Sequence, residues 1–99
     1  MQAYLDHAST SPLRPEALAA MLPFLTEHYG NPSASNAPGR RARLVLDEAR
    51  DRVARSVGCD PGEVVFCSGG TEAANLAASG AMAGSKALCT AIELSLIHI

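Results

Sequence analysis

A short apolar run followed by a glycine-rich turn constrains this sequence more than any other feature. Residues 64–67 are apolar throughout, which is typical of a buried parallel strand, and residues 68–72 read Ser-Gly-Gly-Thr-Glu. A helical stretch follows over residues 73–82, and residues 87–92 form a second β-like run. The order strand, turn, helix, strand predicts a βαβ unit with a right-handed crossover, and therefore an α/β fold.

The turn is also the best candidate for a binding site. Gly69 and Gly70 would let the backbone approach a ligand closely, while the following helix would direct its free N–H groups and positive dipole end toward the turn. The Thr71 hydroxyl could donate to a phosphate oxygen or cap the helix. The turn therefore suits a phosphate. Many βα turns with glycine and a threonine cap bind nothing, so the residues alone leave both readings open.

Two more helices are expected earlier in the chain. Residues 3–5 could form a brief strand, and Pro15 opens a helix that runs to about His28. Pro23 lies inside this helix, where we expect a kink or a boundary. Residues 29–38 are rich in Gly, Pro, Asn and Ser, which predicts a loop.

Residues 39–57 give the clearest helical pattern, with Gly58 as a plausible C-cap. Its apolar residues recur on one face; they are Ala42, Val45, Leu46, Ala49, Val53 and Val57. Two ion pairs at i,i+4 spacing are expected on the opposite face; they are Glu48 with Arg52 and Asp51 with Arg55.

Composition excludes several classes of protein. The 99 residues carry a formal charge of −2 with mixed signs, which argues against a nucleic-acid-binding surface. Aromatic residues are few and alanine is abundant, so we expect the segment to need more chain or a partner for stability. Neither a secretory signal nor a membrane span is recognisable. Three cysteines without a CxxC motif support neither disulfides nor zinc, so we expect reduced thiols in a cytoplasmic protein.

Other polar residues are expected to be structural. His7 follows Asp6, but adjacent residues of a strand point to opposite faces, so a catalytic dyad is not predicted. His28 closes a helix, where a cation suits the dipole. Cys67 has no neighbouring His to activate it and is expected to be a buried thiol. Three arginines are expected to form a solvated helix start: Arg40, Arg41 and Arg43.

Four motifs, in order, resemble those of the cysteine desulfurases, which are class V aminotransferase-type enzymes. Residues 4–12 resemble the family's YLDNAATTP opening, and residues 30–33 resemble its GNPSS loop. Residues 49–58 are similar to the EARERVAxLLG helix, and residues 64–76 to IIFTSGGTEADNLA. Order and spacing agree from residue 4 to residue 93.

The resemblance implies a fold and a cofactor. Residues 1–93 would be the N-terminal portion of a fold type I large domain, with an incomplete sheet, from a homodimeric enzyme. The cofactor would be pyridoxal 5′-phosphate, with its phosphate held by Gly70 and Thr71. The loop around His7 and Ala8 would lie near the substrate, although His7 stands where Asn is commoner.

The resemblance also implies an activity. L-cysteine would be converted to L-alanine, and an enzyme thiolate would take the sulfur as a persulfide. The sulfur would serve iron–sulfur cluster or thio-cofactor biosynthesis through an acceptor protein that the sequence does not identify. Selenocysteine lyases and other class V aminotransferase-like enzymes share these motifs. A small non-catalytic α/β binding module is the alternative of another class.

The sequence departs from the family in its chemical residues. The family's cofactor lysine and persulfide cysteine are not identifiable, because Lys86 has no counterpart and none of the three cysteines matches. Asn36 stands where the loop often carries His. Residues 94–99 replace a segment that begins with the family's ring-stacking His, and His98 is not its counterpart. We therefore expect a truncated fragment, inactive alone, with a non-native tail at 94–99.

Overall fold

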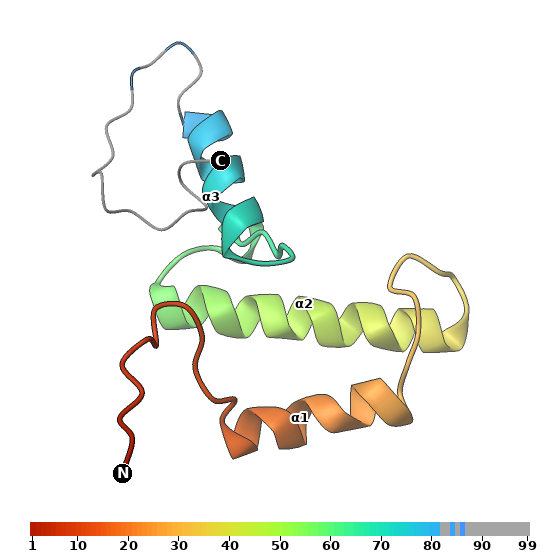
Figure 1. Ribbon diagram of the computed structural model, residues 1–99. Coiled ribbons are helices and arrows are strands. Elements are labelled where there is room, and N and C mark those ends of the chain that lie inside the picture. Colours follow the sequence, from red (N-terminus) through yellow and green to blue (C-terminus); the bar gives the residue numbers. More distant parts are fainter. Residues whose placement is uncertain (82–83, 85, 87–99) are drawn as a thin grey trace. The chain divides into compact units, whose positions relative to one another are not determined.

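The computed structural model describes residues 1–81, 84 and 86. The chain forms two compact units, of which the first is Met1–Pro61 and the second begins at Gly62. The first unit contains helices α1 and α2, and the second contains α3, as Figure 1 shows. Within the described residues no strand is formed, and each helix is too short or too polar to cross a membrane.

Helix α1 spans Pro15–Thr26 and begins at the predicted proline. Pro23 lies inside the helix, which continues for three more residues before it ends. A proline removes a donor but keeps its carbonyl, and the Pro23 carbonyl accepts the N–H groups of Glu27 at 2.9 Å and His28 at 2.8 Å. These two bonds close the last turn, so the helix ends slightly before the predicted His28.

Helix α2 spans Ala37–Val57 and begins earlier than the predicted Gly39. The Asn36 side chain accepts the Gly39 N–H at 2.8 Å, which makes Asn36 the N-cap. Pro38 is tolerated because an N–H in the first turn has no partner within the helix. At the other end Gly58 adopts a left-handed conformation with φ of 75°, which confirms the predicted C-cap.

The loop between α1 and α2 is folded tightly against the start of α2. The Asn31 side chain accepts the Ser33 N–H at 3.0 Å, and the Asn31 carbonyl accepts the Ala34 N–H at 2.9 Å. Gly39 is buried beneath this loop. A Cβ atom at Gly39 would lie 2.6 Å from the carbonyl oxygens of both Asn31 and Ala34. Only glycine therefore fits this first turn of α2.

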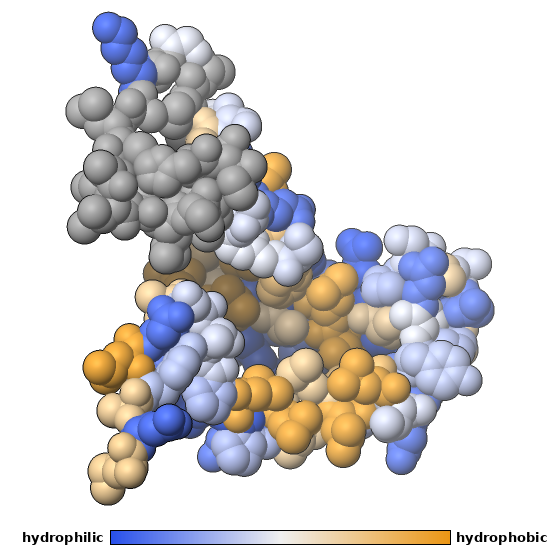
Figure 2. Space-filling model, in the orientation of Figure 1, coloured by the Kyte–Doolittle hydropathy of each residue, from blue (hydrophilic) through white to orange (hydrophobic). Residues whose placement is uncertain are grey.

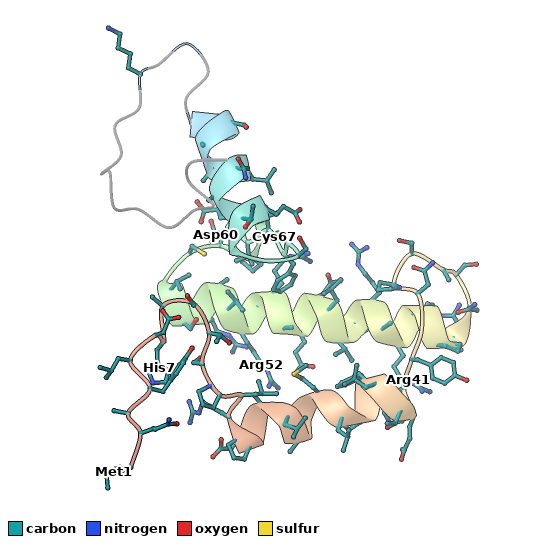
Figure 3. All side chains as sticks on the ribbon, in the orientation of Figure 1. Met1, His7, Arg41, Arg52, Asp60 and Cys67 are labelled. Carbon is teal, nitrogen blue, oxygen red and sulfur yellow. The ribbon has the colours of Figure 1, made fainter. Side chains whose placement is uncertain are left out.

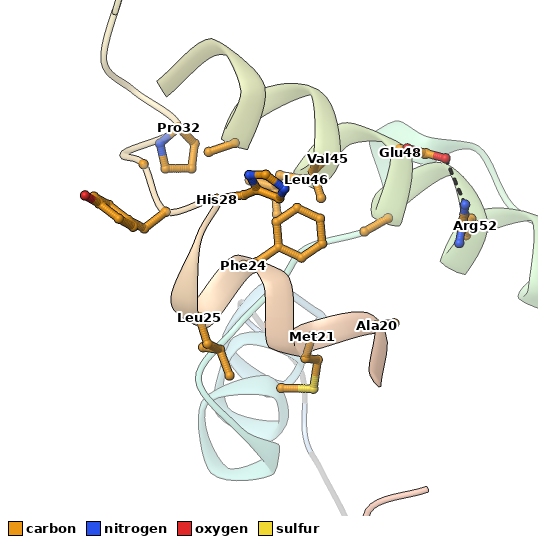
Figure 4. Close-up of a pocket in the computed structure, with 14 residues that line it drawn as sticks. Ala20, Met21, Phe24, Leu25, His28, Pro32, Val45, Leu46, Glu48 and Arg52 are labelled. Atoms are coloured by element: carbon orange, nitrogen blue, oxygen red, sulfur yellow. Dashed lines mark hydrogen bonds and ion pairs between the residues drawn. The ribbon is translucent and has the colours of Figure 1, made fainter. Parts of the chain in front are cut away.

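Helices α1 and α2 lie side by side in opposite directions (Figure 1). Their facing side chains form an apolar groove of about 660 Å³. Figure 4 draws the residues that line this groove. The predicted stripe on α2 is half-buried at Ala42, Val45 and Leu46, whereas Val53 and Val57 are exposed. Apolar side chains gather over α1 on the molecular surface (Figure 2). Among the described residues, Ala54 is the single buried hydrophobic side chain. The described residues thus bury few apolar side chains. That the segment needs more chain or a partner for stability stays a prediction.

The predicted ion pairs of α2 form in one case only. The Arg52 guanidinium lies 2.8 Å from the Glu48 carboxylate, as predicted (Figure 4). The prediction for Asp51 and Arg55 is wrong, because Arg55 Nε donates instead to the Asp51 carbonyl at 3.4 Å. Exposed pairs of this kind contribute only a few tenths of a kcal/mol, so the difference has little energetic weight.

In the second unit, α3 spans Gly70–Ala81 and begins three residues before the predicted start at Ala73. A short 3-10 helix, Pro61–Glu63, precedes the apolar run. Residues 64–67 form no strand in the described part of the chain, so the incomplete sheet is not confirmed. A strand exists only through pairing, and the predicted partner at residues 87–92 lies outside the described residues. The brief strand predicted at residues 3–5 is not formed.

The packing of Gly39 gives a testable contrast with Gly80, which lies in α3 with nothing within 4 Å of its Cβ position. Helix propensity alone favours alanine over glycine by about 1 kcal/mol. We expect Gly80→Ala to raise the thermal midpoint of the helical circular dichroism signal, and Gly39→Ala to lower it through the clash. If both substitutions raise the midpoint equally, the loop does not pack on Gly39.

Candidate functional site

The glycine-rich turn leads directly into the first turn of α3. The Gly69 carbonyl accepts the first helical bond, from the Ala73 N–H at 3.1 Å. The N–H groups of Gly70, Thr71 and Glu72 therefore have no acceptor within the helix and lie at its positive end. All three residues are exposed. The structure thus brings the two predicted site residues, Gly70 and Thr71, together at an end that attracts anions.

Thr71 is a helical residue and not the cap of α3. It occupies the second position of the helix, so the capping alternative from the sequence is wrong. Its hydroxyl has no hydrogen-bond partner in the described part of the chain, and its carbonyl accepts the Asn75 side-chain amide at 2.8 Å. The hydroxyl is therefore available as a donor beside the open N–H groups.

Glu72 is a site residue that the sequence prediction missed. One carboxylate oxygen, Oε2, accepts the Ser68 hydroxyl at 2.5 Å and the Ser68 N–H at 3.0 Å. These two bonds hold the pKa of Glu72 below its usual value, and the bond from the Ser68 hydroxyl has the larger effect. The arrangement is a relative of the capping box, in which a Glu at the third helical position reaches back to residues before the helix. The signal in the sequence is a Ser four residues before a Glu. It was missed because the helix was predicted to begin after Glu72, which left Glu72 outside the first turn.

The donor set of this turn fits a phosphate group. It combines the unpaired N–H groups of the first turn, including those of Gly70 and Thr71, with the Thr71 hydroxyl and the positive end of a helix. The space beside Gly69 is open, since nothing lies within 4 Å of its Cβ position. The Glu72 carboxylate is held by Ser68 and leaves these donors unoccupied.

Cys67 is exposed, so the prediction of a buried thiol is wrong. Its Sγ lies 3.5 Å from the Gly69 carbonyl oxygen, at the edge of the turn (Figure 3). Burial was expected from a strand that the described residues do not form. Cys59 is a half-buried free thiol, and Cys89 lies outside the described residues. Within the described residues no group of three or more His, Cys, Asp or Glu side chains could hold a metal ion.

The loop around His7 is tied by Tyr4, in the other unit of the chain. The Tyr4 hydroxyl lies 3.1 Å from the Asp6 carbonyl and 3.2 Å from the Thr10 carbonyl. The rings of Tyr4 and His7 meet edge to face, with centroids 4.8 Å apart. Asp6 accepts the N–H groups of Ser9 and Thr10 through its carbonyl. The segment around His7 is therefore a turn. The argument that Asp6 and His7 point to opposite faces assumed a strand, which is not formed there.

The arginines at the start of α2 are exposed, as predicted. Arg41 contacts His28 through Nη1 and Nδ1, which are 3.3 Å apart, and Arg40 donates to the Ser35 carbonyl. Arg43 pairs with Asp47 at 3.2 Å. His28 lies just beyond the end of α1, so its contact with Arg41 ties the two helices together.

Two other residues singled out in the sequence have simple places in the structure. Asn36 caps α2, which gives it a structural function where the family often carries His. Lys86 is exposed and belongs to no helix. The residues predicted to form a non-native tail, 94–99, lie outside the described residues.

The contact between Ser68 and Glu72 predicts a pH dependence at the start of α3. Because the folded pKa of Glu72 is lowered, its contribution to stability is present above the unfolded pKa and lost as the pH falls through the folded pKa. We expect the first turn of α3 to fray as Glu72 protonates, and the titration midpoint of its carboxyl carbon, followed by NMR, to rise in Ser68→Ala. An unchanged midpoint in that variant would show that the hydroxyl does not stabilise the carboxylate.

Comparison with known proteins identifies relatives of this chain. It is 47% identical over 79 residues to cysteine desulfurase IscS of Dictyoglomus turgidum, covering 80% of this chain and 20% of the relative. It is 42% identical over 95 residues to cysteine desulfurase IscS 1 of Archaeoglobus fulgidus, covering 91% and 25%. It is 46% identical over 78 residues to the mitochondrial cysteine desulfurase of Drosophila melanogaster, covering 78% and 17%.

The chain spans about a fifth of the length of the curated relatives it matches. No solved structure matches it significantly. The family model described as aminotransferase class-V matches residues 3–97, which is nearly the whole chain and includes the turn at the start of α3. This chain therefore belongs to the aminotransferase class-V family.

Proposed function

We propose that this chain is the N-terminal part of a pyridoxal-phosphate-dependent cysteine desulfurase. The observation that carries the proposal is its identity of 42–47% to relatives named cysteine desulfurase, over 78–91% of its length. The names of these relatives favour a desulfurase over a selenocysteine lyase. The proposal includes a fold type I large domain, to whose sheet residues 64–67 would contribute.

The start of α3 would hold the cofactor phosphate. The N–H groups of Gly70 and Thr71 and the Thr71 hydroxyl are the donors, and the positive end of α3 adds an attraction for the phosphate charge. When bound, pyridoxal phosphate supplies an electron sink for the reacting amino acid. Neither Gly70 nor Thr71 has a thiol or a side chain that titrates near neutral pH, so these residues would anchor the cofactor and would not transfer protons or sulfur.

The substrate of the whole enzyme would be L-cysteine, and its products L-alanine and a persulfide on the enzyme. The sulfur would go to iron–sulfur cluster or thio-cofactor biosynthesis. We propose a homodimer, and a cytoplasmic location supported by free thiols at Cys59 and Cys67.

Cofactor binding by the turn is tested with pyridoxine 5′-phosphate, which keeps the phosphate but lacks the aldehyde that reacts with amines. We expect Thr71→Val to weaken its binding about tenfold in calorimetry, because a hydrogen bond to a charged group is lost. Thr26→Val is the matched control, since it removes a hydroxyl that donates to the Leu22 carbonyl in α1. Equal affinities of Thr71→Val and Thr26→Val would remove Thr71 from the phosphate site.

The isolated chain is expected to lack desulfurase activity. Its one lysine, Lys86, has no counterpart in the family, and no family persulfide cysteine is recognisable. With L-cysteine and pyridoxal phosphate, the chain should release sulfide no faster than the same mixture without the protein. A faster release that disappears in Lys86→Arg would show that this lysine does the chemistry and that the prediction is wrong.

A further inference from the structure

We propose that Glu72 is a positioning residue of the phosphate site: by holding both donors of Ser68, it keeps Ser68 away from a bound phosphate and leaves that phosphate to the first turn of α3, which begins with Gly70 and Thr71. This inference rests on the proposed function, because it concerns the same turn. It says which hydrogen-bond donors at the start of α3 bind Glu72 and which remain for a phosphate.

The contacts of Ser68 show how this division is made. Its N–H and its hydroxyl both donate to Oε2 of Glu72, at 3.0 Å and 2.5 Å, and so neither is open to a ligand. Glu72 is the third residue of α3, whereas Ser68 lies before the helix, so the two bonds tie the preceding backbone to the helix. Gly69 lies between them, and nothing occupies the space within 4 Å of its Cβ position. The Gly69 carbonyl is held by the Ala73 N–H at 3.1 Å, and the two bonds from Ser68 restrain the backbone on the N-terminal side of this glycine.

The two hydrogen bonds also restrain Glu72, because Ser68 holds its carboxylate in place. An unrestrained Glu in the first turn of a helix could turn its carboxylate toward the free N–H groups, since the helix dipole attracts it. Ser68 instead holds the Glu72 carboxylate with two hydrogen bonds, and these bonds keep the pKa of Glu72 below its usual value. The carboxylate and a phosphate thus share the positive end of α3 through different donors. Because Glu72 is exposed, water screens the repulsion between the two anions.

Inorganic phosphate and the ¹⁵N-labelled full chain provide the test near pH 7. In the wild type, phosphate should shift the amide signals of Gly70 and Thr71 and leave that of Ser68 in place. Glu72→Gln should keep this pattern, because the Gln side-chain oxygen can still accept from Ser68. In Glu72→Ala, hydrogen exchange at the Ser68 amide should speed up about tenfold, and phosphate should now shift the Ser68 signal as well.

A second variant keeps the test decisive if Glu72→Ala unfolds α3. Ser68→Ala removes the hydroxyl that restrains Glu72 and leaves the backbone donor. We expect Ser68→Ala to keep the helical circular dichroism signal of the chain and to bind phosphate several-fold more weakly at Gly70 and Thr71, because the carboxylate then competes for their N–H groups.

Four results would overturn the inference. If phosphate shifts Ser68 in the wild type, or if Glu72→Ala leaves both exchange and shifts at Ser68 unchanged, then Glu72 does not divide the donors. If Ser68→Ala binds phosphate as tightly as the wild type, Ser68 does not restrain Glu72. In these cases the proposed cofactor site stands. If phosphate shifts neither Gly70 nor Thr71 in the wild type, the proposed site itself fails, and the inference fails with it.

Discussion

The start of a helix leaves backbone N–H groups without partners, and the way each helix here satisfies them decides what it can do. Helix α2 uses the Asn36 side chain and a proline at Pro38, with Gly39 buried under the preceding loop. Its first turn is therefore occupied by the protein itself. Helix α3 uses its own Glu72 to hold Ser68 and keeps the N–H groups of Gly70 and Thr71 open. The same constraint yields a structural cap in α2 and, in α3, the open N–H groups to which we assign anion binding.

The apolar surface of the first unit belongs to the same account. Helix α1 exposes large apolar side chains such as Leu22 and Leu25, and the groove that it forms with α2 remains apolar. Helices that are apolar over much of their surface are typical of the interior of larger domains. This surface agrees with a chain that spans about a fifth of the length of its relatives. In the proposed whole enzyme, these helices would form part of the fold type I large domain.

The sequence predicted the helices better than their starts or the strands. The apolar period along residues 42–57 identified α2, and glycine at Gly58 marked its end, because both signals are local. The starts of α2 and α3 were placed too late, because Asn36 was read as part of a loop and Glu72 as part of a turn. Strand pairing depends on residues distant in the sequence, so the apolar run at 64–67 did not fix it.

The candidate site was predictable in part for the same reason. Gly70 and Thr71 belong to a local motif, and the motif order along the chain predicted the family that the comparisons show. The function of Glu72 depends on where the helix begins, and the exposure of Cys67 depends on whether a neighbouring strand forms. Neither is contained in the identity of the residue.

The most direct test of the account is a crystal structure of this chain with pyridoxal phosphate. We predict phosphate oxygens within about 3 Å of the backbone nitrogens of Gly70 and Thr71, with the Ser68 donors still on Glu72. A phosphate bound elsewhere on the chain, or one bound through Ser68 with Glu72 displaced, would contradict the account.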